Sequence, residues 1–260
     1  SILPSADDLR IVFYDGATYQ ELPRYVINPG TANTFVWFRT VEDISASGTD
    51  NRYWMYYGNS SAGSPPNNIN DVMMPPVDGN TVALYHFEET SGSTLNDSVG
   101  STNGTLVESF VYGSAGKFGR SLTFEGDGDY VDLGDPSAFE LSNGTIEFWV
   151  SHNSLSGSQG YFSQDDTGQV ENGHIFSSKS GSTNLVNYRL QEDDSPGAGG
   201  SETISSISPI DTGWHHIAIT LGNGSSNELY IDNVKQGPSG SLDNGINGNS
   251  NNFLIGALNY

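Results

Sequence analysis

Short apolar runs, broken every few residues by glycine, asparagine and serine, constrain this chain more than any other feature. No stretch of helical length repeats apolar residues at positions i, i+3 and i+4. The chain has 32 glycines, and glycine and asparagine tolerate the positive φ angles of tight turns between strands. At 260 residues it is long enough for one large β-sandwich and a smaller partner. The pattern predicts an all-β protein.

The first segment, residues 1–58, is predicted to form a small β domain. Apolar runs typical of strands occur at Leu9–Tyr14, Tyr25–Ile27, Thr34–Arg39 and Tyr53–Tyr57. Residues 59–79 contain two proline pairs among asparagine and serine. Proline cannot donate to a strand ladder and holds the chain extended, so we predict a linker or a surface strap there.

Residues 80–260 are predicted to form an antiparallel β-sandwich of the jelly-roll type. Strands are expected at Val82–Phe87, Ser121–Phe124, Asp129–Leu133, Thr145–Val150, His174–Ser178, Tyr188–Gln191, Trp214–Leu221, Asn227–Ile231 and Asn252–Ile255. Long connections rich in glycine, serine and asparagine separate them, notably residues 151–173 and 193–206. Four tryptophans fall in strand patterns and are expected in the core: Trp37, Trp54, Trp149 and Trp214.

The charge of the chain is strongly negative. Its formal net charge is −22, with only 9 lysines and arginines. Such a field repels nucleic acid and anionic membranes and attracts cations. An acidic surface also keeps a protein soluble in saline surroundings, which is the alternative to a role in calcium binding. No apolar run approaches the length of a membrane span. We therefore expect no nucleic-acid partner and no direct membrane insertion. The absence of cysteine excludes thiol catalysis.

Five ordered motifs after residue 80 resemble the signatures of LamG-like, concanavalin A-like domains. They are Ala83–Glu89 with the following Asp97-Ser98 and Asn103–Leu106, then Ser121–Gly134, Thr145–Val150, Trp214–Ala218 and Glu228–Asn233. In the last motif Asn233 stands where the family usually has glycine, and asparagine also visits the left-handed region. The resemblance implies a jelly roll of two antiparallel sheets.

The first segment resembles a small domain of unknown function that often precedes LamG-like domains in bacterial and archaeal surface proteins. The likeness is carried by Asp8-Leu9-Arg10, Leu22-Pro23, Val36-Trp37-Phe38 and Tyr56–Asn59. That family's usual opening strand is not present before Ser1. The two resemblances together imply an extracellular or cell-surface location.

The LamG-like resemblance also implies a final strand. In the family, the run resembling Asn252–Gly256 is normally followed by a strand that pairs beside the opening strand, and this sequence stops at Tyr260. We expect either that the strand lies outside these residues or that another subunit donates it to the unpaired edge. A sheet closed by this chain's own residues, for instance by part of Ser1–Tyr14, would contradict both expectations.

The sequence contains no pattern typical of a catalytic site. Glycosidases of this fold carry Glu-x-Asp-x-Glu on one strand, and alternation points the acids into the cleft. Glu228-x-Tyr230-x-Asp232 has two acids on one face but belongs to a family signature. His215 and His216 are adjacent, so we expect one to line the core and one to be exposed. No nucleophile elbow or phosphate loop occurs.

Calcium is the metal that the acidic turns would suit, since it takes six to eight oxygen ligands. Jelly rolls of the family commonly hold a structural calcium that fastens the first strand to the last. The resemblance makes Glu88 and Asp97 the first candidate site, and Asp127 and Asp129 the second. The alternative is that these acidic turns face water without a metal.

Sugar binding needs exposed aromatic rings with polar groups around them. The candidates in or beside the long loops are Tyr161, Phe162, Tyr188 and Gln191. The alternative is that these loops pack their own aromatics as a small satellite core. Asn-x-Ser/Thr sequons, which are glycan acceptors when they lie in exposed turns, begin at Asn59, Asn96, Asn103, Asn143 and Asn223.

Three functions are compatible with this reading. The leading hypothesis is a non-catalytic extracellular module for adhesion or glycan recognition, whose partner is a glycan or a cell-surface molecule. The second is a structural subunit of an extracellular filament, sheath or surface layer, whose partners are further copies of the chain. The third, a glycoside hydrolase, is kept because the fold hosts such enzymes, and fold alone is a weak argument for function.

Overall fold

The computed structural model describes residues 2–3, 5–27, 29–32, 34–42, 44, 48–66, 72, 79–126, 128–141, 143–164, 174–191, 201–222, 227–238, 240 and 251–257. The chain divides into two compact units, Ser1–Thr81 and Val82–Tyr260. Strands make up nearly all the regular structure in the described ranges, as the all-β prediction requires. No helix in that part of the chain is long and apolar enough to cross a membrane.

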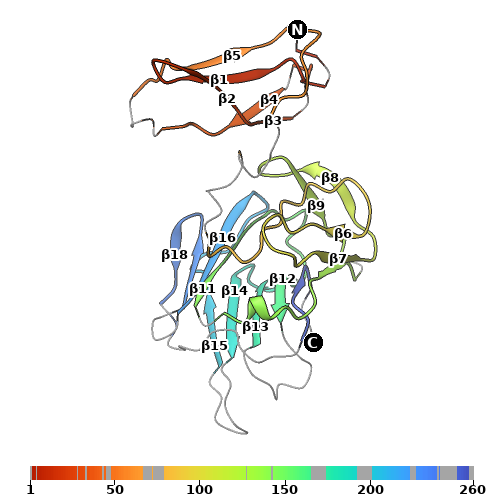
Figure 1. The fold of residues 1–260 in the computed structure, drawn as a ribbon. Coiled ribbons are helices and arrows are strands. Elements are labelled where there is room, and N and C mark those ends of the chain that lie inside the picture. The colour runs from red at the N-terminus through yellow and green to blue at the C-terminus, as the bar shows by residue number, and fades with distance from the viewer. Residues whose placement is uncertain are drawn as a thin grey trace. The chain divides into compact units, whose positions relative to one another are not determined.

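The first unit contains two small antiparallel sheets (Figure 1). One has the order β2-β1-β5, from Tyr19–Leu22, Arg10–Tyr14 and Tyr53–Tyr56. The other pairs β3 with β4, from Arg24–Ile27 and Phe35–Phe38. The buried core of the first unit lies between these sheets and is made by Ile11, Phe13 and Leu22, with Val36, Phe38 and Tyr53 packed against them.

Buried polar side chains tie the start of this unit to its sheets. The carboxylate of Asp8 accepts hydrogen bonds from the backbone N–H groups of Leu3 and Gly58, both at 2.8 Å. Arg24 is buried and donates from its guanidinium to the carbonyls of Leu9 and Ala6. These bonds give a structural reason for the Asp8-Leu9-Arg10 and Gly58 motifs, because each buried polar group must find a partner.

The second unit is a jelly-roll sandwich. Its larger sheet has the order β15-β14-β13-β12-β19-β10-β7-β6. The strands are Ser201–Ser205, Val186–Gln191, His174–Lys179, Gln159–Gln164, Leu254–Ile255, Tyr130–Asp132, Gly104–Val107 and Thr94–Leu95. The smaller sheet has the order β11-β16-β17-β18, from Gly144–Val150, His215–Leu221, Glu228–Ile231 and Val234–Gln236. A separate hairpin joins β8 (Val111–Ala115) to β9 (Arg120–Thr123).

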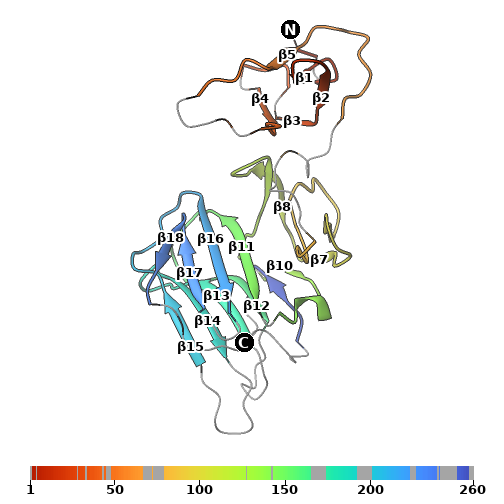
Figure 2. The ribbon, with the colours of Figure 1, turned by 60° about the vertical axis from the view of Figure 1, so that its left-hand side comes forward.

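The core of the second unit lies between its two sheets, which Figures 1 and 2 show as separate layers. Ile175 and Leu190 of the larger sheet belong to the same buried cluster as Ile217, Ile219 and Leu229 of the smaller one. Complete burial of one such aliphatic side chain stabilises the fold by about 1.5–3 kcal/mol. The alternation of Ile217 and Ile219 with more exposed residues therefore fixes which face of β16 points inward.

Three of the expected secondary-structure assignments are wrong. Val82–Phe87 is not a strand; it makes one isolated bridge, Tyr85 to Asp97, and Phe87 has a φ of 58°. Residues 159–164 and 201–205 were expected in loops but form β12 and β15. Their serine and glutamine residues do not alternate with apolar ones, yet Ser163 and Gln164 are buried because β13 and β19 pair with β12 on either side.

Candidate functional site

The outer face of the smaller sheet carries an exposed tryptophan. Strand β11 alternates, so Ile146, Phe148 and Val150 pack against the core while Glu147 and Trp149 point outward. Trp149 is 38% exposed. The expectation that this indole fills the core is therefore wrong, and the reason is strand alternation: its neighbours on either side already occupy the inner face. Trp37 and Trp54 are also exposed, whereas Trp214 is half-buried.

Three side chains surround the Trp149 indole. The Lys117 ammonium nitrogen lies 4.7 Å from the ring centroid, within cation–π range. The Phe118 ring meets the indole edge-on, with 5.7 Å between centroids. His216, which faces Trp149 across the β11–β16 pair, has its ring centroid 5.2 Å away. We call Lys117, Phe118, Glu147, Trp149 and His216 the Trp149 cluster.

The turn that brings Lys117 and Phe118 to this position depends on glycine. Gly116 donates its N–H to the carbonyl of Gly119 at 3.1 Å and closes the β8–β9 hairpin. Gly119 has a φ of 60°, and a Cβ there would lie 1.9 Å from Oε1 of Glu88. The same Glu88 oxygen accepts the backbone N–H of Arg120 at 2.7 Å. Glu88 thus fastens this turn, and no larger residue fits at position 119.

The Trp149 cluster combines an exposed aromatic surface with hydrogen-bonding groups. Phe118 is as exposed as Trp149, at 38%. Nε2 of His216 lies 3.4 Å from Oε2 of Glu147, and Lys117 adds a second donor. Aromatic rings stack on the apolar faces of sugars, while such donors and acceptors orient the hydroxyls. The arrangement can therefore bind a small polar ligand that has one flat apolar face.

The carboxylates of Glu228 and Asp232 are engaged in contacts that serve the fold. Glu228 accepts hydrogen bonds from the Tyr230 hydroxyl and from Nζ of Lys235, the latter at 2.5 Å. Asp232 lies in the β17–β18 turn with a φ of 50° and contacts His215 and the backbone N–H of His216. A glycosidase needs one carboxyl that gives a proton and one that attacks or activates water. In these contacts neither group is arranged for that role.

His215 lies between two carboxylates. Its Nδ1 is 2.7 Å from Asp232 and its Nε2 is 3.0 Å from Asp211. Burial alone would lower the pKa of His215, but these two carboxylates outweigh burial and raise that pKa. His215 lies on the same inward face of β16 as Ile217 and Ile219, and His216 lies on the outer face beside Trp149. The two rings thus point to opposite faces, although both are half-buried.

Stability is expected to fall as the pH rises above 6.5. A group whose pKa is raised on folding gives its full stabilisation below the unfolded value, 6.5 for histidine, and loses it as the pH passes the folded value. Melting temperatures of the parent and of His215→Gln, measured across this range, should differ in slope. Burial lowers the pKa values of His86 and His152, which gives a slope of the opposite sign, and both histidines are present in parent and variant alike, so the comparison isolates His215. Equal slopes would contradict the assignment.

The carboxylates predicted to bind calcium accept internal hydrogen bonds. Asp97 accepts four backbone N–H groups, and Glu88 holds the Arg120 N–H. Asp129 accepts the N–H groups of Glu125 and Gly126. Asp127 lies outside the described residues. Within the described ranges, no group of three or more histidines or carboxylates is arranged to hold a metal ion. These contacts give the carboxylates a structural role that needs no metal. Calcium binding at Glu88, Asp97 and Asp129 stays a prediction.

The predicted sugar-binding aromatics lie in strands and not in loops. Tyr161 and Phe162 belong to β12 and Tyr188 belongs to β14, and all three are buried in the core. Tyr161 and Phe162 were predicted in a loop, which is wrong, whereas Tyr188 lies in a strand as predicted; the burial of all three rings leaves none exposed for stacking on a sugar. The hydroxyl of Tyr161 lies 3.0 Å from Nε2 of His152. Gln191 ends β14, and its side chain lies outside the described part.

The structure describes four of the five sequon asparagines. Asn59, Asn96, Asn103 and Asn143 are exposed. Asn223 lies outside the described residues. Asn96 donates from its amide to Glu89 at 3.1 Å, and the Asn103 amide oxygen accepts the N–H of Asp97 at 2.9 Å. Glycosylation at these positions stays a prediction.

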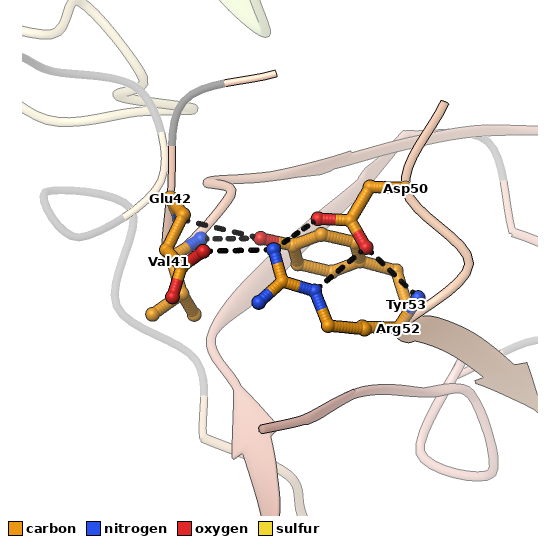
Figure 3. Close-up of polar contacts among 5 residues, drawn as sticks. All are labelled: Val41, Glu42, Asp50, Arg52 and Tyr53. Carbon is orange, nitrogen blue, oxygen red and sulfur yellow. Dashed lines mark hydrogen bonds and ion pairs between the residues drawn. The ribbon is translucent and has the colours of Figure 1, made fainter. Parts of the chain in front are cut away.

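A polar cluster in the first unit serves its fold (Figure 3). The Arg52 guanidinium donates to Asp50 at 2.7 Å and to Glu42 at 2.8 Å, and these carboxylates raise the pKa of Arg52. The Tyr53 hydroxyl accepts the N–H of Val41 at 2.8 Å. These contacts fasten the segment before β5 to that strand. The two carboxylates thus hold the Arg52 guanidinium in place.

Two family models match the chain. The concanavalin A-like lectin/glucanases superfamily matches residues 125–260, and a domain of unknown function, DUF2341, matches residues 5–103. The second match extends past Thr81 into β6, a strand of the larger sheet of the sandwich. No curated protein matches the chain.

Several solved structures are similar to this chain. Domain 4 of AbnA, a GH43 extracellular arabinanase from Geobacillus stearothermophilus in complex with arabinotriose, is 20% identical with a TM-score of 0.52. That match covers 69% of this chain and 84% of the other. The Ruminococcus gnavus IT-sialidase CBM40 is 12% identical, with a TM-score of 0.36 over 46% of this chain and 66% of its own. The botulinum neurotoxin serotype D binding domain is 13% identical, with a TM-score of 0.44 over 68% and 47%.

Proposed function

Because the chain belongs to the concanavalin A-like lectin/glucanases superfamily, we propose that it is a non-catalytic extracellular module that recognises glycans through the Trp149 cluster. The observation that carries the proposal is the exposed indole of Trp149 with Phe118, Lys117 and His216 around it. Contiguous exposed apolar surface with polar groups around it, as Trp149 and Phe118 form with Lys117 and His216, is typical of an interaction site. Domain 4 of AbnA, which shares the fold, was solved with arabinotriose and supports the same ligand class.

Each part of the cluster has a role in this proposal. The exposed ring of Trp149 stacks on the apolar face of a sugar, and Phe118, whose ring is at 89° to the indole, contacts the edge of the sugar. Lys117 and His216 donate to its hydroxyls, and Glu147 accepts from them. Lys117 lies over the indole in the free protein. It moves aside or contacts the sugar rim when the ligand binds, which a long flexible side chain does at low cost.

Replacing Trp149 by alanine is expected to weaken glycan binding by about 10- to 100-fold, equal to roughly 1.4–2.8 kcal/mol. A glycan array with and without calcium first identifies the ligand, and calorimetry then compares parent and variant. The loss of stability should be smaller than the about 3–5 kcal/mol that a core tryptophan costs. Val234→Ala, at an exposed apolar residue of β18 in the same sheet, is the matched control. Unchanged affinity of Trp149→Ala, or no glycan bound by the parent, contradicts the proposal.

A structural subunit is the second candidate function, and one observation favours it. Strand β11 is seven residues long and stands at the end of its sheet, where β16 is the one strand paired with it among the described residues. An open edge of this length can accept a strand from another chain. Electron microscopy of the purified protein separates the candidates, because a subunit polymerises and a recognition module stays discrete.

A further inference from the structure

We propose that the first unit carries a second sugar-binding surface, on the outer face of the sheet β2-β1-β5, and that its ligand is a neutral polysaccharide. This surface consists of Tyr14, Tyr19, Trp54 and Tyr56, and we call it the aromatic face. It lies on a different unit of the chain from the Trp149 cluster. The inference goes beyond the proposed function and does not depend on it.

Strand register places the four rings on one side of the sheet. Ile11 and Phe13 of β1 are buried in the core of the unit, so alternation turns Arg10, Val12 and Tyr14 outward. The residues paired with these three share that outward face. They are Tyr56 opposite Arg10, Trp54 and Glu21 opposite Val12, and Tyr19 opposite Tyr14.

The rings on this face are open to solvent. Tyr19 is 68% exposed and Trp54 is 52% exposed, and Tyr56 is similar at 51%. Tyr14, which is half-buried, and Tyr19 are stacked with 4.5 Å between their centroids, so these two rings support one another. The Tyr14 hydroxyl donates to the carbonyl of Gly16 at 2.8 Å, so this ring is held in place. Such a platform is already formed before a ligand binds.

One ion pair supplies the polar groups of the aromatic face. Nε of Arg10 lies 2.9 Å from Oε1 of Glu21, and both side chains remain partly accessible. Arg10 also donates to the carbonyl of Gly63. The guanidinium is therefore fixed beside the rings, where a guanidinium and a carboxylate together match the donors and acceptors of a sugar diol.

Charge decides which ligand suits this face. The first unit, residues 1–81, contains 9 aspartates and glutamates and only 4 arginines, so it is itself acidic and repels nucleic acid and anionic polysaccharides. On the face, Arg10 is paired with Glu21, so this pair has no excess charge that would attract an ionic partner. A neutral polysaccharide is not repelled. Its flat apolar ring faces stack on tyrosine and tryptophan, and its hydroxyls reach Arg10 and Glu21.

The test uses the full chain carrying Trp149→Ala, so that binding through the second unit does not contribute. Affinity electrophoresis against arabinan, galactan, mannan and β-glucan identifies a neutral polysaccharide that retards this protein. Adding Trp54→Ala or Tyr19→Ala should then weaken binding by at least about tenfold, whereas Trp54→Tyr should retain most of it. Phe35→Ala, at an exposed ring of β4 in the same unit, should change nothing.

Three results would overturn the inference. The first is a Trp149→Ala chain that no neutral polysaccharide retards. The second is equal retardation after Trp54→Ala or Tyr19→Ala, with melting temperatures showing that the variants are folded. The third is a parent dimer that Trp54→Ala converts to a monomer, because a second copy would then occupy the face. None of these outcomes depends on whether Trp149 itself binds a glycan, so the two proposals can fail separately.

Discussion

Replacing Lys179 by methionine is expected to lower the free energy of unfolding of the second unit by about 2–6 kcal/mol. Lys179 is fully buried, and its ammonium donates at 2.7 Å to the carbonyls of Leu155 and Gly157. It also contacts the side-chain oxygen of Asn184 at 3.2 Å. Methionine fills a similar volume but makes neither bond; a hydrogen bond from a charged donor is worth about 1.5–3 kcal/mol, and water recovers part of the loss at Gly157, which is exposed. Denaturant unfolding measures the difference.

The ammonium of Lys179 joins two turns at one end of the sandwich. One contains Leu155 and Gly157, and the other contains Gly181 and Asn184. A Cβ on Gly181 would lie 2.7 Å from the backbone of Gly157, so the turns are already in close contact. Lys235→Met is the control, since this lysine is partly exposed in its ion pair with Glu228 and should cost under about 1 kcal/mol. Equal stabilities of Lys179→Met and the parent would show that other donors or water satisfy these carbonyls.

Strands with strict alternation were predictable from the sequence alone. Thr145–Val150 and Trp214–Leu221 appear as β11 and β16 with bounds shifted by one residue, because large apolar residues recur at every second position, as Ile146, Phe148 and Val150 do in β11. Strand β12 lacks this pattern. Its run of glycine, serine and glutamine around two aromatic rings is typical of a loop, and only its pairing with β13 and β19 makes it a strand.

The candidate site could be predicted only in part. The alternation of Ile146, Phe148 and Val150 already implies an outward Trp149, and the error was to rank the hydrophobicity of the indole above that alternation. The other members were not predictable. Lys117 lies in a turn 32 positions earlier and His216 on a strand 67 positions later, and no local pattern specifies the register that joins them.

Asp97 shows why acidic residues near turns are difficult to interpret from sequence. A carboxylate at such a position suits either a calcium ion or a set of backbone N–H donors, and both uses favour an aspartate beside glycine. The structure favours the second use. A Cβ on Gly100 would lie 2.6 Å from Oδ2 of Asp97, so the loop closes tightly around the carboxylate.

Replacing Asp97 by alanine is expected to destabilise the second unit by roughly 3–5 kcal/mol, because each hydrogen bond to a charged group is worth about 1.5–3 kcal/mol and part is recovered by water. The N–H groups of Leu84, Val99 and Gly100 lie 3.0 Å from Oδ1, and that of Thr102 lies 3.2 Å from Oδ2. Removal of the carboxylate leaves all four without their acceptor. Urea unfolding measures the loss, and Ser98→Ala, at an exposed neighbour, is the control.

Acid titration and chelation distinguish the two uses of Asp97. Burial raises the pKa of Asp97, but the four N–H donors outweigh it and lower the pKa below 3.8. The stabilisation is therefore present above pH 3.8 and is lost as the pH falls through the folded-state value. Asp97→Asn should flatten this acid limb. If the backbone N–H groups are the only partners of Asp97, Asp97 contributes no effect of calcium or of chelator on the melting temperature. If chelation lowers the melting temperature of the parent but not of Asp97→Asn, Asp97 binds calcium and the N–H assignment is wrong.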